Sequence, residues 1–172
     1  DFAVETALYD IESKMNSKTL CSYLNTSAYT KVAMNGIEGI TTHTKYNVIK
    51  IKAGFRNLYD EKKYLEKLTL KYGEDIKFRV DLNEAYDLPR AIRFCKEMND
   101  FNIDYIEQPL SRDSLEDTAE LRLHTDFHIA LDESVYNMSS VDAILEHNAA
   151  DVFIVKPQMT GGFSRTNKLI KY

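Results

Sequence analysis

The segment Val48-Ile49-Lys50-Ile51-Lys52 (VIKIK) decides the fold. It lies in a stretch rich in β-branched residues, 46–53, that predicts a β-strand. Successive side chains of a strand point to opposite faces, so the two lysines share one face and the two isoleucines share the other. The isoleucines favour packing against helices, whereas the lysines favour water or acidic partners. The segment therefore predicts a strand between a helix layer and a polar site.

The rest of the chain alternates between strand-like and helix-like patterns. Further strands are predicted at residues 31–37, 76–82, 104–107, 128–132 and 151–156. Helical periodicity is predicted at residues 4–15, 58–73 and 88–98, in helices that begin near Ser114 and Ser139, and at 163–172. This alternation indicates parallel βαβ units and the α/β class. A barrel of eight units needs about 250 residues, so about six units form either an open sheet or part of a longer protein.

Composition narrows the classes of partner. The 172 residues are 44% hydrophobic and 28% charged, which is typical of one globular domain. The net charge of −5 means that the chain has no overall excess of positive charge for binding nucleic acid. No apolar run approaches the roughly 18 residues that span a bilayer. Cys21 and Cys95 do not make a disulfide framework. We expect a cytoplasmic protein that binds neither nucleic acid nor membrane, and its oligomeric state stays open.

Five of the predicted strands end in an ionisable residue. These residues follow one another at intervals of 24 to 29 positions, about the length of one βα unit: Lys52, Asp81, Glu107, Asp132 and Lys156. Each therefore occupies the same place in successive units, which in a parallel β/α barrel is the C-terminal rim where active sites lie. A solvated sheet face would explain one such residue, but five matched positions favour a site.

The three carboxylates among these residues predict a metal. Asp81, Glu107 and Asp132 lie on neighbouring strands, and carboxylate oxygens are the ligands that Mg²⁺ prefers. Without a cation, three converging carboxylates would repel one another. Lys52 and Lys156 lie on strands two and six, which are diametrically opposed in an eight-stranded barrel. A substrate held over the metal would meet one ammonium group on each side.

Five motifs at these positions resemble the enolase superfamily, in its muconate-lactonizing-type branch. They are KIK (50–52), DLNE (81–84), IEQP (106–109), LDES (131–134) and VKP (155–157). Within that branch, the Lys-Pro pair at 156–157, Thr160-Gly161-Gly162 and the opening FAVETALYDIESK (2–14) are most similar to the o-succinylbenzoate synthases of menaquinone biosynthesis. The resemblance implies that residues 1–172 are a partial C-terminal β/α-barrel domain, without the family's N-terminal capping domain and last barrel strands.

The resemblance also implies a role for each residue. Asp81, Glu107 and Asp132 would bind Mg²⁺, and Lys52 would remove the proton α to the carboxylate of a small substrate to give an enediolate. The protonated Lys52 would then donate its proton to the departing hydroxyl group. Lys156 would stay cationic on the opposite side. The supporting residues would be Lys50, Asn83 and Glu133, with Gly161 and Gly162 near the substrate.

Three functions are consistent with these residues. The first is a Mg²⁺-dependent lyase that dehydrates its substrate to o-succinylbenzoate. The second is a racemase or epimerase of dipeptides or N-acylamino acids, in which Lys52 and Lys156 act as bases on opposite faces. The Lys156-Pro157 pair favours the dehydratase. The third is a non-catalytic barrel protein, and the presence of all five rim residues argues against it.

Overall fold

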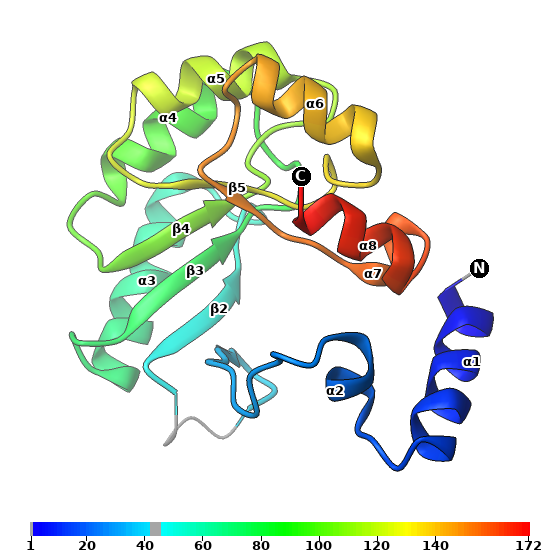
Figure 1. Ribbon diagram of the computed structural model, residues 1–172. Helices are drawn as coiled ribbons and strands as arrows, with labels where there is room; N and C mark the ends of the chain where they lie inside the picture. The colour runs from blue at the N-terminus through cyan, green and yellow to red at the C-terminus, as the bar shows by residue number, and fades with distance from the viewer. Residues whose placement is uncertain (1, 42–45) are drawn as a thin grey trace.

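Six parallel strands in chain order form one sheet in the computed structural model, which describes residues 2–41 and 46–172 (Figure 1). Their bounds are β1 (Gly36–Ile37), β2 (Val48–Lys52), β3 (Lys77–Asp81), β4 (Ile103–Glu107), β5 (Ile129–Leu131) and β6 (Val152–Phe153). The α/β class with parallel β/α units is confirmed.

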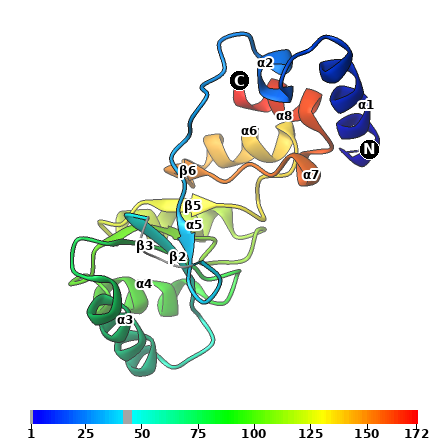
Figure 2. The same cartoon turned by 90° about the horizontal axis from the view of Figure 1, so that it is seen from below.

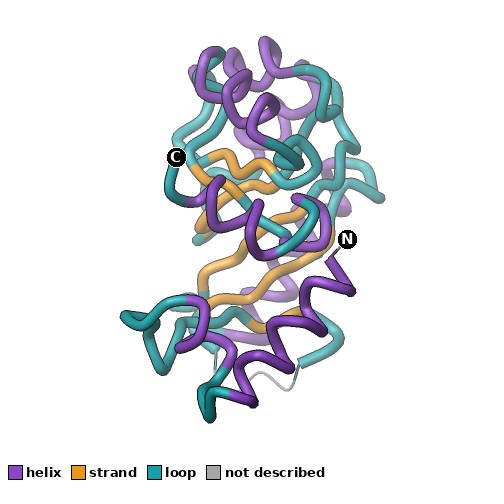
Figure 3. The backbone as a smooth tube through the Cα atoms, turned by 45° about the vertical axis from the view of Figure 1, so that its right-hand side comes forward, coloured by secondary structure: helices purple, strands orange, loops and turns teal. Residues whose placement is uncertain are grey.

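Helices precede, connect and follow the strands. They are α1 (Phe2–Met15), α2 (Leu20–Leu24), α3 (Leu58–Tyr72), α4 (Leu88–Glu97), α5 (Leu115–Leu123), α6 (Met138–Glu146), α7 (Pro157–Thr160) and α8 (Phe163–Ile170). Figure 3 shows the strands running between segments of helix. In Figure 2, α1 and α2 lie beside α8, at the opposite end of the molecule from α3. None of the helices in the described ranges is both long and apolar enough to cross a membrane.

Side-chain caps explain where three of the connecting helices begin. Asn57 accepts a hydrogen bond from the Asp60 N–H group at the start of α3, and Asp87 does the same for Arg90 in α4. Asn137 and Ser140 form a reciprocal capping box at the start of α6. These caps satisfy N–H groups that have no partner within the helix.

The core lies between the sheet and the connecting helices. The exposed fraction is 1% for Ile49 and Ile51, whereas the Lys52 side chain is 55% exposed, so the predicted alternation along β2 is confirmed. Apolar side chains of the neighbouring strands and of the helices are buried with the isoleucines, among them Phe78, Val80, Ile106, Leu65, Leu68, Phe94 and Leu121. The opposite face of the sheet is left for polar side chains.

Strand register aligns the ends of β2, β3 and β4. Lys52 pairs with Asp81, and Asp81 pairs with Glu107. Register partners in a parallel sheet share a face, so these three side chains form one row. Asp132 follows β5 directly, and Lys156 comes three residues after β6.

The first strand is shorter than the sequence predicts. Residues 31–37 read as a strand, but only Gly36 and Ile37 pair with β2. β1 is at the edge of the sheet, so its residues have one neighbouring strand to bond with. Val32 and Met34 are 74% and 70% exposed, so no core holds this segment in register. The short helices α2 and α7 were not predicted.

Candidate active site

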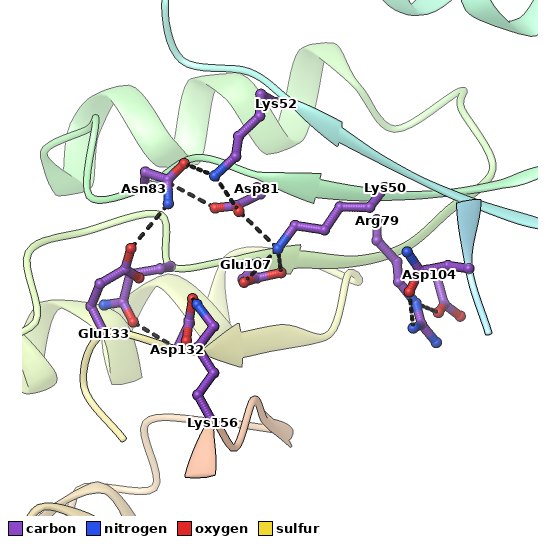
Figure 4. Close-up of polar contacts among 12 residues, drawn as sticks. Lys50, Lys52, Arg79, Asp81, Asn83, Asp104, Glu107, Asp132, Glu133 and Lys156 are labelled. Carbon is purple, nitrogen blue, oxygen red and sulfur yellow. Dashed lines mark hydrogen bonds and ion pairs between the residues drawn. The ribbon is translucent and has the colours of Figure 1, made fainter. Parts of the chain in front are cut away.

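The Lys50 ammonium group lies between two carboxylates at the ends of β3 and β4. Its Nζ atom donates to both oxygens of Glu107, at 2.8 and 2.7 Å, and lies 2.8 Å from Asp81 Oδ2. Lys50 lies two residues before the end of β2, and its side chain extends toward the carboxylates at the strand ends (Figure 4). Each carboxylate side chain is only 1% exposed, so Lys50 supplies the charge that buried carboxylates require.

Lys52 approaches the same carboxylate from the outside of the row. Its Nζ atom donates to Asp81 Oδ2 at 2.8 Å and to the side-chain oxygen of Asn83. Asn83 in turn donates to Glu133 Oε1 at 3.0 Å. Glu133 Oε2 is buried and has no hydrogen-bond partner among the described residues. Lys52, Asn83 and Glu133 thus form a polar chain across three strand ends.

Lys156 approaches from the other side. Its ammonium group contacts Asp132 Oδ2. Figure 4 shows Lys52 and Lys156 entering from opposite sides, with Asp81, Glu107 and Asp132 between them. The side chains of the two lysines are 55% and 41% exposed, so both are open in part to solvent. This arrangement can present two amino groups to opposite faces of one bound molecule.

The carboxylates differ in how readily they hold a proton. Burial disfavours the charge of Asp81, but hydrogen bonds from Lys50 and Lys52 outweigh it and hold the pKa of Asp81 below its usual value. Burial raises the pKa of Glu107, and the charges of Asp81 and Asp132 add to this effect against the hydrogen bond from Lys50. Burial also opposes the charge of Lys50, yet its two acidic partners raise the pKa of Lys50 overall.

The donor set fits a hard divalent cation by its chemistry. Three carboxylates at neighbouring strand ends, those of Asp81, Glu107 and Asp132, supply the oxygen ligands that Mg²⁺ prefers. As the side chains are placed, no three acidic, His or Cys groups of the described residues are arranged around one ion position. Lysine ammonium groups form ion pairs with the carboxylates instead. A bound cation would replace these ammonium groups as the positive charge that neutralises the carboxylates.

The loop after β3 holds Asn83, which the sequence analysis named, and Glu84, whose contact with Arg112 it missed. Asn83 and Glu84 have positive φ angles of 42° and 63°, which are uncommon for residues other than glycine. Glu84 accepts from the backbone and guanidinium N–H groups of Arg112, at 2.7 to 3.3 Å, and so joins the loop after β3 to the loop after β4. The acidic end of the DLNE motif was the available signal, but its partner could not be read from the sequence.

The two glycines after β6 lie at the junction of α7 and α8. Gly161 ends α7 and Gly162 precedes α8. The Glu5 carboxylate of α1 accepts from the Ser164 N–H group, at 3.3 and 3.4 Å, in the first turn of α8. Among the described residues, these hydrogen bonds join the turn to α1, and none joins it to the lysine–carboxylate cluster. A role of Gly161 and Gly162 near a substrate stays a prediction.

Comparison with known proteins identifies the family. A family model described as enolase C-terminal domain-like matches residues 31–172. The chain belongs to this family. It is a member of the enolase superfamily. The five ionisable residues at its strand ends all lie within the matched region.

Individual relatives agree with this assignment. The chain is 27% identical over 180 residues to a chloromuconate cycloisomerase of Cupriavidus pinatubonensis, covering 97% of this chain and 49% of the relative. It is 27% identical over 139 residues to an L-amino acid-D/L-Glu epimerase of Francisella philomiragia, covering 80% of this chain and 37% of the relative. The chain thus spans half or less of the length of these relatives.

A solved structure supports the fold. The L-talarate dehydratase of Polaromonas sp. JS666, solved with Mg and L-glucarate, superposes with a TM-score of 0.82 at 25% identity. The match covers 96% of this chain and 50% of the dehydratase. The enolase-superfamily fold predicted from the motifs is therefore confirmed. These comparisons do not separate o-succinylbenzoate synthases from the other members of the superfamily.

Proposed function

We propose that this chain carries the proton-transfer site of a Mg²⁺-dependent enzyme that removes the proton α to the carboxylate of a small substrate. The observation behind the proposal is the placement of Lys52 and Lys156 on opposite sides of three buried carboxylates. Removing a proton from such a carbon creates negative charge on the substrate carboxylate. Cationic groups on both sides would stabilise that charge where it develops.

Each residue has a defined part in the proposal. Lys52 is the base, because its side chain is 55% exposed and its amino group is held at the end of β2 by Asp81 and Asn83. Lys156 lies on the other side and supplies either positive charge or a second base. Asp81, Glu107 and Asp132 would bind Mg²⁺, which when bound supplies positive charge to the substrate carboxylate.

The first candidate reaction is dehydration to o-succinylbenzoate. Lys52 takes the α-proton, the bond to the hydroxyl group on the neighbouring carbon breaks, and Lys52 returns the proton to the departing hydroxyl group, which leaves as water. This candidate is supported by the Lys156-Pro157 pair and by Thr160-Gly161-Gly162. It requires Lys156 as a charge and not as a base.

The second candidate is racemisation or epimerisation of a dipeptide or an N-acylamino acid. Here one lysine removes the α-proton and the opposite lysine returns a proton to the other face. The opposed approach of Lys52 and Lys156 is the specific observation that favours it. The similarity to an L-amino acid-D/L-Glu epimerase supports it as well.

Exchange of the substrate α-proton in D₂O, followed by NMR on the full-length protein, tests both candidates. Lys52→Ala should reduce exchange of an α-proton that faces Lys52 by about 10⁴-fold, the upper end for a general base. Lys62→Ala is a matched control, since Lys62 pairs with Glu97 on the surface at 3.9 Å. Exchange in Lys52→Ala at the level of Lys62→Ala would overturn the assignment of Lys52 as the base.

Lys156→Ala separates the two candidates. A dehydratase that uses Lys156 for its charge retains exchange through Lys52. A two-base epimerase instead loses exchange from one stereoisomer selectively. Assays with the dehydration substrate and with a dipeptide panel then identify the product.

A further inference from the structure

Gln108 lies at the centre of a hydrogen-bond network beneath the carboxylates. Its side chain is fully buried. Oε1 accepts from the N–H groups of Asp132 and Ser134, at 3.0 and 3.3 Å. Nε2 donates to the Leu110 carbonyl oxygen and to Ser134 Oγ, both at 3.0 Å. Two N–H donors on one side and a carbonyl on the other fix the orientation of this amide.

The backbone of Gln108 adds two further links. Its N–H group donates to the Ala130 carbonyl oxygen in β5, and its carbonyl oxygen accepts from the Glu84 N–H group after β3, both at 2.8 Å. Its φ angle is +39°, in the left-handed region that residues other than glycine seldom adopt. Such a conformation persists where the surroundings hold it in place. One residue therefore joins the ends of β3, β4 and β5.

These three strand ends carry the three carboxylates. Glu107 immediately precedes Gln108, and Asp132 is held by its backbone N–H group at the Gln108 amide. Asp81 is three residues before Glu84, whose N–H group bonds the Gln108 carbonyl. The relative positions of Asp81, Glu107 and Asp132 consequently depend on Gln108, although its side-chain hydrogen bonds within the described residues reach none of the three carboxyl groups.

We infer that Gln108 is a positioning residue that sets the spacing of Asp81, Glu107 and Asp132 and thereby the affinity of the site for a divalent cation. The inference rests on the proposed function, in which these carboxylates bind Mg²⁺. A methionine would fill a similar volume but would leave the N–H groups of Asp132 and Ser134 without acceptors in a buried place. The loop carrying Asp132 would then move to find other partners.

The test is the Mg²⁺ affinity of the full-length protein, measured by isothermal titration calorimetry with MgCl₂ and without substrate. Gln108→Met should weaken Mg²⁺ binding by about 10- to 100-fold, the usual effect of losing a group that orients metal ligands. Thr118→Val is the control. It removes a hydrogen bond from another buried side chain, to the Ser114 carbonyl oxygen in α5, and should leave the Mg²⁺ dissociation constant unchanged.

Each outcome bears on one statement. If the wild-type protein does not bind Mg²⁺, the proposed function fails. If the wild type binds Mg²⁺ and Gln108→Met binds it equally well, or if Thr118→Val loses as much affinity, the positioning role of Gln108 is wrong. Should Gln108→Met not fold, Gln108→Asn replaces it, because it keeps the amide but shortens its reach by one methylene. A folded Gln108→Asn protein with wild-type affinity would equally overturn the inference.

Discussion

The ammonium group of Lys50 holds both carboxylate oxygens of Glu107, at 2.8 and 2.7 Å. The pair crosses β3, because Lys50 projects from β2 and Glu107 ends β4. Lys50 therefore occupies the space between carboxylates that we propose as metal ligands. The same positive charge that stabilises the buried carboxylates competes with Mg²⁺ for them.

We predict that Lys50→Met destabilises the metal-free protein and strengthens Mg²⁺ binding. Removing one partner of a buried ion pair leaves an uncompensated charge, at a cost of roughly 3 kcal/mol. With the competing ammonium group gone, Mg²⁺ can neutralise Glu107 and Asp81 without displacing it. Urea unfolding with and without MgCl₂ measures both effects. Lys71→Met, which removes a half-exposed ion pair with Glu38, is the control. Weaker Mg²⁺ binding in Lys50→Met would contradict the competition.

A second prediction concerns the buried carboxylate of Glu61, which is 1% exposed. It accepts from the N–H groups of Gly54 and Arg56, at 2.8 and 3.0 Å, and so holds the loop that follows Lys52. Glu61→Ala leaves these groups without an acceptor and should lower the free energy of unfolding by about 2 kcal/mol. The loop that follows Lys52 would loosen too, so α-proton exchange should fall.

The matched control for this change lies on the same helix. Glu66 is exposed on α3, and Glu66→Ala should change the free energy of unfolding by no more than about 0.5 kcal/mol. Chemical denaturation of both variants gives the comparison. Equal stability of Glu61→Ala and Glu66→Ala would show that the buried carboxylate does not hold the loop.

The parts of the site that follow from local patterns could be predicted from the sequence. Alternation along β2 places Lys50 and Lys52 on one face, and the structure has both on the polar face of the sheet. The regular interval between ionisable residues reflects one strand end per βα unit, which is why Asp81 and Glu107 come into register. These features depend on short-range geometry that repeats along the chain.

The remaining contacts depend on geometry that no local pattern encodes. Lys50 bonds two strands away, to Glu107, and this choice follows from register and side-chain length. Gln108 is part of the IEQP motif, but the sequence does not predict its left-handed backbone or the hydrogen bond that its side chain accepts from the Asp132 N–H group. The bond from Ser164 to Glu5 spans 159 residues. Such partners are set by tertiary packing.

Acid should weaken the junction between α5 and β5 through Asp151. Burial raises the pKa of this carboxyl group, but hydrogen bonds from Arg122 and from the Ile129 N–H group outweigh it, so the folded-state pKa is below the ordinary value. A depressed pKa contributes stability above the unfolded-state value of about 3.9, and this contribution disappears as the pH falls through the folded-state pKa.

Asp151→Asn isolates this contribution. The variant should be about 1–3 kcal/mol less stable than the wild type at pH 7, and the difference should shrink below about pH 4 as the wild-type carboxylate takes up a proton. Urea unfolding from pH 7 to pH 3 measures the difference, with the exposed Asp100→Asn as the control. A difference that stays constant over this range would show that the ionised carboxylate is not what stabilises the junction.

The final prediction concerns the contact between Gly162 and Glu5. A Cβ atom at Gly162 would clash with Glu5 Oε2, and φ is +122°. Gly162→Ala should therefore push the Glu5 carboxylate off the first turn of α8 and loosen α1, leaving the ring contacts of Phe2 and Tyr9 with Phe163 and the hydrogen bond between Tyr9 and Ser164. Hydrogen exchange of the amides in residues 2–15 should become faster, as measured by mass spectrometry.

Gly73→Ala separates the clash from backbone strain. Gly73 has a φ angle of +97°, but in the described part of the chain nothing lies within 4 Å of a Cβ atom there. This variant bears the cost of a left-handed alanine, about 1–2 kcal/mol, at the end of α3 and should leave exchange in α1 unchanged. Because both variants strain the backbone and only Gly162→Ala meets Glu5, faster exchange confined to Gly162→Ala identifies the carboxylate contact as the attachment of α1. Equal protection of α1 in both variants would mean that the aromatic contacts and the Tyr9–Ser164 hydrogen bond hold the helix without Glu5.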